Sequence, residues 1–226
     1  MNILALDCAV SRISLAVKTD TQFISTTYDI GMRQSEILVP AIDELLKKCN
    51  LKPSELDYTA LTAGPGSFTG LRLGFSALKA IELAWNVPVY GISSLKVYSY
   101  PYSELNMPVI SCIDANKDKF YACITEGNTI LLEDGDWEIP TICSTISDFE
   151  KVFLCGPDAL KLAELIKKEN TFLEVLVPKV QSQTTESLVK LTQKMIAEGE
   201  PTLKDFDGPV YLRASEAEIK LGSDPR

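Results

Sequence analysis

The chain reads Gly64-Pro65-Gly66-Ser67-Phe68-Thr69-Gly70-Leu71-Arg72-Leu73-Gly74 directly after the apolar run 58–63. The same stretch opens a long, apolar-rich segment that ends near Trp85. This order predicts a strand, a glycine turn and a helix. Glycines at such a junction let two backbones come close, and the first N–H groups of a helix have no partner within it. A phosphate-binding loop is therefore the first hypothesis to test.

The spacing excludes both common nucleotide-binding loops. A Walker loop requires Lys and then Ser or Thr directly after its last glycine, whereas Leu71 and Arg72 follow Gly70. The dinucleotide fingerprint requires glycine or alanine three residues after Gly66, and Thr69 holds that position. The glycines of this stretch therefore need another explanation.

The predicted helix is apolar around most of its surface. One face carries small and aliphatic residues, and a neighbouring face carries large apolar residues. These are Gly70, Gly74, Ala77, Ile81 and Ala84 on the first face, and Leu71, Phe75 and Leu78 on the second. Such a helix is buried on more than one side. We expect one face to cover a sheet and the small-residue face to admit a second helix, from this chain or from a partner.

Composition describes a globular protein with an acidic second half. The chain has 226 residues, 46% of them hydrophobic, and a net charge of −9. Residues 1–104 carry a net charge of −1 and residues 105–226 a net charge of −8. An acidic chain without a basic stripe is a poor candidate for binding nucleic acid alone. The weakly charged first half is the better candidate for the core of a protein interface.

The chain contains no histidine, and this excludes several classes of active site. His-based zinc sites, Ser-His-Asp triads and histidine general bases all require it. The six cysteines form no CxxC pair, so we expect no metal site and no catalytic residue in this chain. Cys8, Cys112, Cys123 and Cys155 lie in apolar runs and are expected in buried strands. Without a signal-peptide pattern or an 18-residue apolar window, a cytoplasmic location with reduced thiols is the simplest expectation.

Both halves of the chain repeat one order of predicted elements. Each begins with three extended segments at hairpin spacing and continues with alternating helices and strands. We therefore predict an α/β protein of two lobes, each a mixed sheet with flanking helices. The expected boundaries are 1–103 for the N-terminal lobe, 104–213 for the C-terminal lobe and 214–226 for a polar, frayed tail.

The first strand of each predicted lobe ends in an aspartate, Asp7 or Asp114. Two such lobes resemble the actin, Hsp70 and sugar-kinase class, in which two Asp-bearing hairpins organise a metal-bound nucleotide across a cleft. The resemblance implies a vestigial nucleotide site at Asp7, Asp114 and Gly156. The alternative is that each aspartate caps the turn after its strand. No glycine follows Asp7 to surround a phosphate, so intrinsic nucleotide binding is not expected.

A closer resemblance is to the TsaB family of bacterial tRNA threonylcarbamoyladenosine biosynthesis proteins, also called YeaZ-like. Its blocks occur here in order and spacing, most strongly over residues 1–125. They are residues 2–7, 34–42, 64–74, 91–95 and 113–115, with Pro209-Val210-Tyr211-Leu212-Arg213 near the end. The chain departs from the family pattern at Gln34, where the family has His, and at Cys8-Ala9, where it has Thr-Ser. The effect of these departures stays open.

The resemblance implies an actin-like ATPase, or ribonuclease H-like, fold and a non-catalytic subunit. TsaB resembles the catalytic paralogue TsaD, which carries two histidine metal ligands and transfers a threonylcarbamoyl group to the adenosine beside the tRNA anticodon. The implied partners are TsaD in a heterodimer, TsaE in a ternary complex and a second copy in isolation. The implied contact with tRNA is made only through the complex.

The implied subunit contact uses two helices of the first lobe. The resemblance implies that the contact residues on the first helix are Gln34, Ser35, Leu38, Ile42 and Leu45. On the second helix, the implied contact residues are Gly70, Arg72, Leu73, Gly74, Ala77 and Ile81. The alternative for each of these residues is packing within the core of the chain itself.

Two other functions stay open at this point. A small kinase of the same superfamily would use Asp7 or Asp114 to hold magnesium-bound ATP, although the missing hairpin glycine speaks against it. A peptidase ranks last, because the chain has no histidine metal ligand and no nucleophile–base pair. Weak ATP or ADP binding at a lobe or subunit interface is not excluded.

Overall fold

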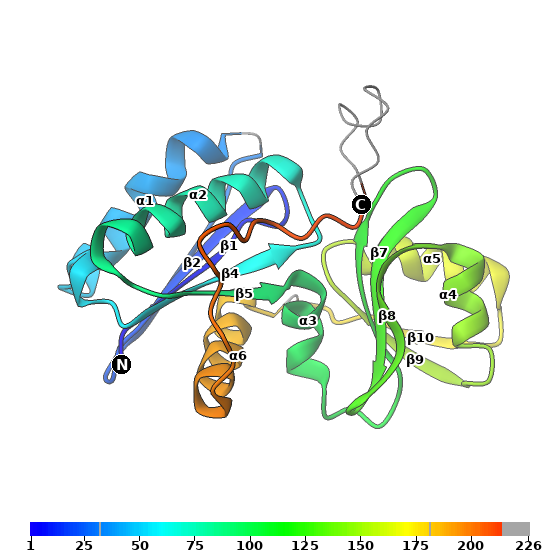
Figure 1. The fold of residues 1–226 in the computed structure, drawn as a ribbon. Coiled ribbons are helices and arrows are strands. Elements are labelled where there is room, and N and C mark those ends of the chain that lie inside the picture. Colours follow the sequence, from blue (N-terminus) through cyan, green and yellow to red (C-terminus); the bar gives the residue numbers. More distant parts are fainter. Residues whose placement is uncertain (32, 181, 214–226) are drawn as a thin grey trace. The chain divides into compact units, whose positions relative to one another are not determined.

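The computed structural model describes residues 1–31, 33–180 and 182–213 and divides into two compact units (Figure 1). Unit 1 comprises Met1–Val97 and Gln183–Val210, and unit 2 comprises Tyr98–Ser182 and the residues from Tyr211 onward. The chain therefore passes between the units after Val97, after Ser182 and again after Val210. The predicted tail, 214–226, lies outside the described residues.

The sheet of unit 1 has the strand order β3-β2-β1-β4-β5. The first three strands form an antiparallel meander, and β4 and β5 continue the sheet in parallel on the other side of β1. The strands are β1 (Ile3–Asp7), β2 (Arg12–Lys18), β3 (Phe23–Asp29), β4 (Tyr58–Gly64) and β5 (Val89–Ser93). Because β1 and β4 are central, nearly every residue in them is buried.

Helices cover both faces of this sheet. Figure 1 shows α1 (Gln34–Lys48) and α2 (Phe68–Trp85) side by side on one face and α6 (Thr184–Glu198) on the other. Ser67 caps α2, because its hydroxyl accepts the Gly70 N–H at 3.2 Å. Asn86 ends α2 in the left-handed conformation. The short elements are the 3₁₀ turn Pro53–Glu55, α3 (Ser94–Ser99) and the 3₁₀ turn Tyr100–Tyr102.

The position of α6 corrects the predicted lobe boundaries. The helix α6 packs on β1, β2, β4 and β5 of unit 1, although it follows the strands of unit 2 in the sequence. The prediction that residues 104–213 form one continuous lobe is therefore wrong for 183–210. The physical reason is that one face of the unit 1 sheet would stay uncovered without α6.

Unit 2 repeats the topology of unit 1. Its sheet has the order β10-β9-β6-β7-β8, in which β6 occupies the place of β1. The strands are β6 (Val109–Asp114), β7 (Lys119–Glu126), β8 (Thr129–Glu138), β9 (Lys151–Cys155) and β10 (Glu174–Leu176). The helices are α4 (Ile139–Thr145), which the sequence analysis missed, and α5 (Ala159–Glu169). This confirms the predicted α/β architecture of two mixed sheets with flanking helices.

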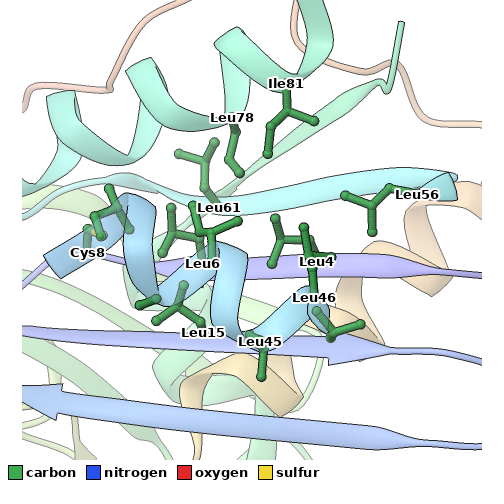
Figure 2. Close-up of a cluster of buried hydrophobic side chains, with 14 of the residues drawn as sticks. Leu4, Leu6, Cys8, Leu15, Leu45, Leu46, Leu56, Leu61, Leu78 and Ile81 are labelled. Carbon is green, nitrogen blue, oxygen red and sulfur yellow. The ribbon is translucent and has the colours of Figure 1, made fainter. Parts of the chain in front are cut away.

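Each unit has its own hydrophobic core. In unit 1, Leu4 and Leu6 of the sheet meet Leu45 of α1 and Leu78 of α2 (Figure 2). In unit 2, the core gathers around Phe120 and takes in both β6 and α5. Cys8, Cys112 and Cys155 are buried as small core residues, as predicted, whereas Cys123 is half-buried. Within the described residues, no helix has the length and apolar content needed to cross a bilayer.

Candidate protein-binding surface

The glycine turn before α2 packs against the turn that follows β1. The Ser67 N–H donates to the Ala9 carbonyl at 2.6 Å. A Cβ atom on Gly66 would lie 2.3 Å from that same carbonyl oxygen, so any side chain there would clash. The close approach of two backbone turns therefore explains these glycines, and phosphate binding is not needed to explain them.

Most residues of the two apolar faces of α2 point into unit 1, whereas Ala77 is half-buried and Ala84 is exposed. Gly70, Leu71, Gly74, Phe75, Leu78 and Ile81 are all buried. Gly74 faces Leu6 and Cys8 of the β1 end, because a Cβ placed on it would lie 3.6–3.8 Å from their side chains. At Gly70, the small-residue face admits both the end of β1 and α1, because a Cβ there would lie 2.2 Å from the Cys8 carbonyl oxygen and 2.9 Å from Gln34 Oε1. At Gly74, the neighbours belong to the end of β1 and not to a second helix.

Most of the predicted contact residues are covered by their own unit. Gln34 is buried and donates from Nε2 to the Val10 carbonyl at 2.6 Å. The others lie in the core or against it, namely Leu38, Ile42, Leu45, Gly70, Gly74 and Ile81. These residues position the two helices, and their side chains do not form the accessible surface. Their burial within unit 1 agrees with the alternative of core packing.

The accessible surface consists of the outward-facing residues of α1 and α2. Of the predicted contact residues, Ser35 and Arg72 are exposed, and Leu73 and Ala77 are half-buried. The Arg72 guanidinium lies 3.9 Å from the centre of the Phe68 ring. Two exposed apolar residues that the sequence analysis missed belong to the same two helices, namely Val39 on α1 and Leu83 on α2. We call these residues together the outer helix surface.

Leu83 is the clearest member of the outer helix surface. Its side chain is 88% exposed, although it lies on a helix whose other large aliphatic residues are buried or half-buried. The helical repeat does place Leu83 with Arg72, Ser76 and Ala80, away from the buried face. That signal was present in the sequence, but it was obscured because α2 is apolar around most of its surface.

The aspartate at the end of β1 caps a turn. The Asp7 carboxylate is buried, and its Oδ1 accepts the Ala9 N–H at 3.0 Å and the Thr62 hydroxyl at 2.9 Å. Burial, together with the neighbouring Asp7 carboxylate, raises the pKa of the Cys8 thiol far above its ordinary value. Cys8 is therefore a protonated core thiol and not a nucleophile at neutral pH.

The corresponding aspartate of unit 2 has the same local role. Asp114 Oδ1 accepts the Asn116 N–H at 2.9 Å, and its other oxygen pairs with Lys161. Partial burial acts to raise the pKa of Asp114, but hydrogen bonds from Lys161 and Asn116 outweigh it and leave that pKa below its ordinary value. The Asp114 N–H donates to Asp158 at 2.8 Å. Both aspartates thus support the turn-capping alternative.

Gly156 is explained by backbone packing in unit 2. Its φ is +98°, and a Cβ there would lie 2.3 Å from the Cys112 carbonyl oxygen. Within the described residues, no cluster of three or more His, Cys, Asp or Glu side chains is arranged to hold a metal ion. The outer helix surface is therefore the best candidate for a functional site among the predicted ones.

Comparison with known proteins gives one family and several relatives. Residues 31–199 match the family model described as TsaD, tRNA N6-adenosine threonylcarbamoyltransferase. The chain is 25% identical to the tRNA threonylcarbamoyladenosine biosynthesis protein TsaB of Escherichia coli K12, over 98% of each chain. It is 26% identical to TsaB of Bacillus subtilis 168, over 59% of this chain and 58% of that protein.

Two solved structures show the same fold. YeaZ from Pseudomonas aeruginosa superposes with a TM-score of 0.73 and 22% identity, covering 93% of this chain and 99% of that one. A Bacteroides thetaiotaomicron protein described as having an actin-like ATPase fold gives a TM-score of 0.51 and 11% identity, over 84% and 95% of the two chains. The repeated sheet order of the two units is thus that of an actin-like fold.

Proposed function

Because the chain belongs to the family of TsaD, tRNA N6-adenosine threonylcarbamoyltransferase, and is TsaB-like in sequence and fold, we propose that it is a non-catalytic subunit of that tRNA modification system. In this proposal, it binds a TsaD chain through the outer helix surface and stabilises it in a competent form. Threonylcarbamoyl transfer to the tRNA adenosine takes place on TsaD.

The chemistry of the chain supports the non-catalytic role. With no histidine, it has no imidazole to hold a metal or to transfer a proton. Asp7 is engaged with Ala9 and Thr62, and the raised pKa of Cys8 keeps that thiol protonated. The negative net charge supports tRNA contact through the complex and not by this chain alone.

The observation that carries the partner proposal is the exposure of Leu83 on α2. Large apolar side chains on an otherwise polar helix face lose their water on association, and this drives binding. Arg72 contributes a residue type that is enriched among the residues that dominate binding energy at interfaces. We further propose that a second copy covers this surface in isolation and that TsaE joins the complex with TsaD.

Reconstitution of threonylcarbamoyl transfer tests the proposal. The threonylcarbamoyl-transfer activity of TsaD from the same organism is measured on tRNA with and without this chain. A mixture of the two proteins is also run on a size-exclusion column. We expect activity and a joint peak only when both are present. Absence of both would contradict the proposal and would turn attention to ATP turnover by the isolated chain.

A matched pair of variants tests the surface itself. Leu83→Asp places a charge on the outer helix surface, and Leu160→Asp places one on a similarly exposed leucine of unit 2. We expect Leu83→Asp to abolish the joint peak while Leu160→Asp keeps it, both with unchanged circular dichroism. Equal effects of the two variants would assign the contact to another surface.

A further inference from the structure

A turn in the C-terminal segment presents a fully exposed phenylalanine beside α2. We call residues 199–213 the C-terminal strap; it follows α6 and ends the described part of the chain. The Phe206 side chain has the largest relative exposure of the exposed large hydrophobic residues, at 101%. Its ring therefore contributes no packing to the fold. Single exposed apolar residues are common, so the surroundings decide whether this one has a role.

The backbone that carries Phe206 is fixed on both sides. The Asp207 N–H donates to the Lys204 carbonyl at 3.1 Å, and the Lys204 N–H donates to Asp207 Oδ2 at 2.8 Å. These two bonds close a four-residue turn with Phe206 at its third position. The Leu203 N–H donates to the Val89 carbonyl at 2.8 Å and ties the start of the turn to the edge of the sheet.

The turn is joined directly to α2. Lys79 Nζ donates to the Lys204 carbonyl at 2.7 Å, and the same ammonium group pairs with Glu82. Residues four apart on a helix lie one above the other, so Leu83 adjoins Lys79 on this side of α2. The turn that carries the exposed Phe206 is thus bonded to α2 one helical turn from Leu83.

We propose that Phe206 is an anchor residue that inserts into an apolar pocket of the TsaD-family chain that covers α2. The inference rests on the proposed function and names a contact outside the two helices. A rigid turn that presents an aromatic ring loses little conformational entropy on binding, which is the property of an interface hot spot. Asp205 and Asp207 flank the ring, so the rim of the receiving pocket is expected to be basic.

The test measures the affinity of the full chain for TsaD from the same organism by calorimetry. It compares the unmodified chain, Phe206→Ala and Phe172→Ala, the last being a matched control because Phe172 is 95% exposed in unit 2. We expect Phe206→Ala to raise Kd by about tenfold or more and Phe172→Ala to leave it unchanged. Neither variant should change the unfolding midpoint, because neither ring is packed.

Each other outcome overturns a defined part of the inference. If the unmodified chain does not bind TsaD, the proposed function fails and the anchor with it. If Phe206→Ala binds as the unmodified chain does while Leu83→Asp does not, the anchor is wrong and the proposed function stands. If Phe206→Ala abolishes self-association by light scattering but not TsaD binding, the occupant of the anchor is a second copy, and the proposal for TsaD is overturned.

Discussion

Two glycines one helical turn apart in α2 face the end of β1 at different distances. A Cβ atom on Gly70 would lie 2.2 Å from the Cys8 carbonyl oxygen. A Cβ atom on Gly74 would meet its nearest neighbour, a Leu6 methyl, at 3.6 Å, which is an ordinary contact. The first glycine is therefore required by geometry, whereas the second is a helical position that an alanine can occupy.

Replacing each glycine by alanine should change stability in opposite directions. Gly74→Ala should raise the free energy of unfolding by about 0.5–1 kcal/mol, because alanine loses less backbone entropy in a helix. Gly70→Ala should lower it by about 1–3 kcal/mol, because the added methyl pushes α2 from the Cys8 carbonyl. Urea unfolding of both variants measures this. A Gly70→Ala protein as stable as the unmodified chain would show that α2 shifts without cost.

At the residue scale, the sequence pattern did not separate the buried side chains of α1 and α2 from the exposed ones. The spacing of Leu38, Ile42 and Leu45 is the same for a helix buried in its own core and for one buried in a partner. The side chains that distinguish the two cases, Val39 and Leu83, break the apolar pattern of the buried face. Recognising them requires knowing which side of each helix meets the sheet.

Arg213, at the end of the described chain, is bonded to two residues of its own unit, unit 2. Arg213 Nε and Nη2 each donate to one oxygen of Asp136 at 2.8 Å, and Nη1 donates to the Ala115 carbonyl at 2.7 Å. Both charged side chains are largely buried, with 23% and 17% exposure. Paired charges in this forked geometry interact more strongly than pairs on an open surface. Arg213 also belongs to the terminal block that resembles the TsaB family.

A double-mutant cycle should detect the ion pair between Arg213 and Asp136 as a coupling energy. For Arg213→Met and Asp136→Asn, we expect a coupling energy of about 1–3 kcal/mol in denaturant unfolding. The control cycle uses Lys119 and Glu138, an ion pair of 3.2 Å whose members are more exposed. Its coupling should stay below about 1 kcal/mol. Equal coupling in the two cycles would contradict the role assigned to Arg213.

At the element scale, the hydrophobic periodicity predicts most helices and strands, but it does not predict which of them pack against one another. Nothing in the sequence pattern of α6 indicates which of the two sheets it covers. The helix α4 was missed because Pro140, Thr141 and Ser144 interrupt its apolar residues. The strand β8 continues to Glu138 through the segment 133–136, whose acidic residues and glycine have low strand propensity.

The whole molecule consists of two units with one topology, and only the order of elements revealed this from the sequence. The first strand of each unit ends in an aspartate that accepts an N–H two residues later, at Ala9 and at Asn116. A glycine and a proline follow the next parallel strand in both units, at Gly64-Pro65 and at Gly156-Pro157. The local sequence was sufficient to predict turns at these positions. The assignment of residues 183–210 to unit 1 depends instead on long-range packing, which the local sequence does not indicate.

Fragments of the chain should fold according to the units and not according to the halves of the sequence. Residues 1–103 lack α6, so one face of their sheet stays uncovered, and we expect them to give a poorly dispersed NMR spectrum. Adding the separate peptide 183–210 to residues 1–97 should restore dispersion, because it returns residues 199–210 of the strap and the buried Leu188 and Leu191 of α6. Dispersed signals from residues 1–103 alone would contradict this expectation.

The discontinuity of unit 1 has a consequence for the order in which the protein is made. Domains generally fold as units, beginning at the N-terminus while the ribosome is still adding residues. Here the first strands to emerge belong to a unit whose last helix and strap are translated after residue 182. Unit 2 has emerged almost completely by then. The part of the chain that is synthesised first is therefore expected to complete its fold last.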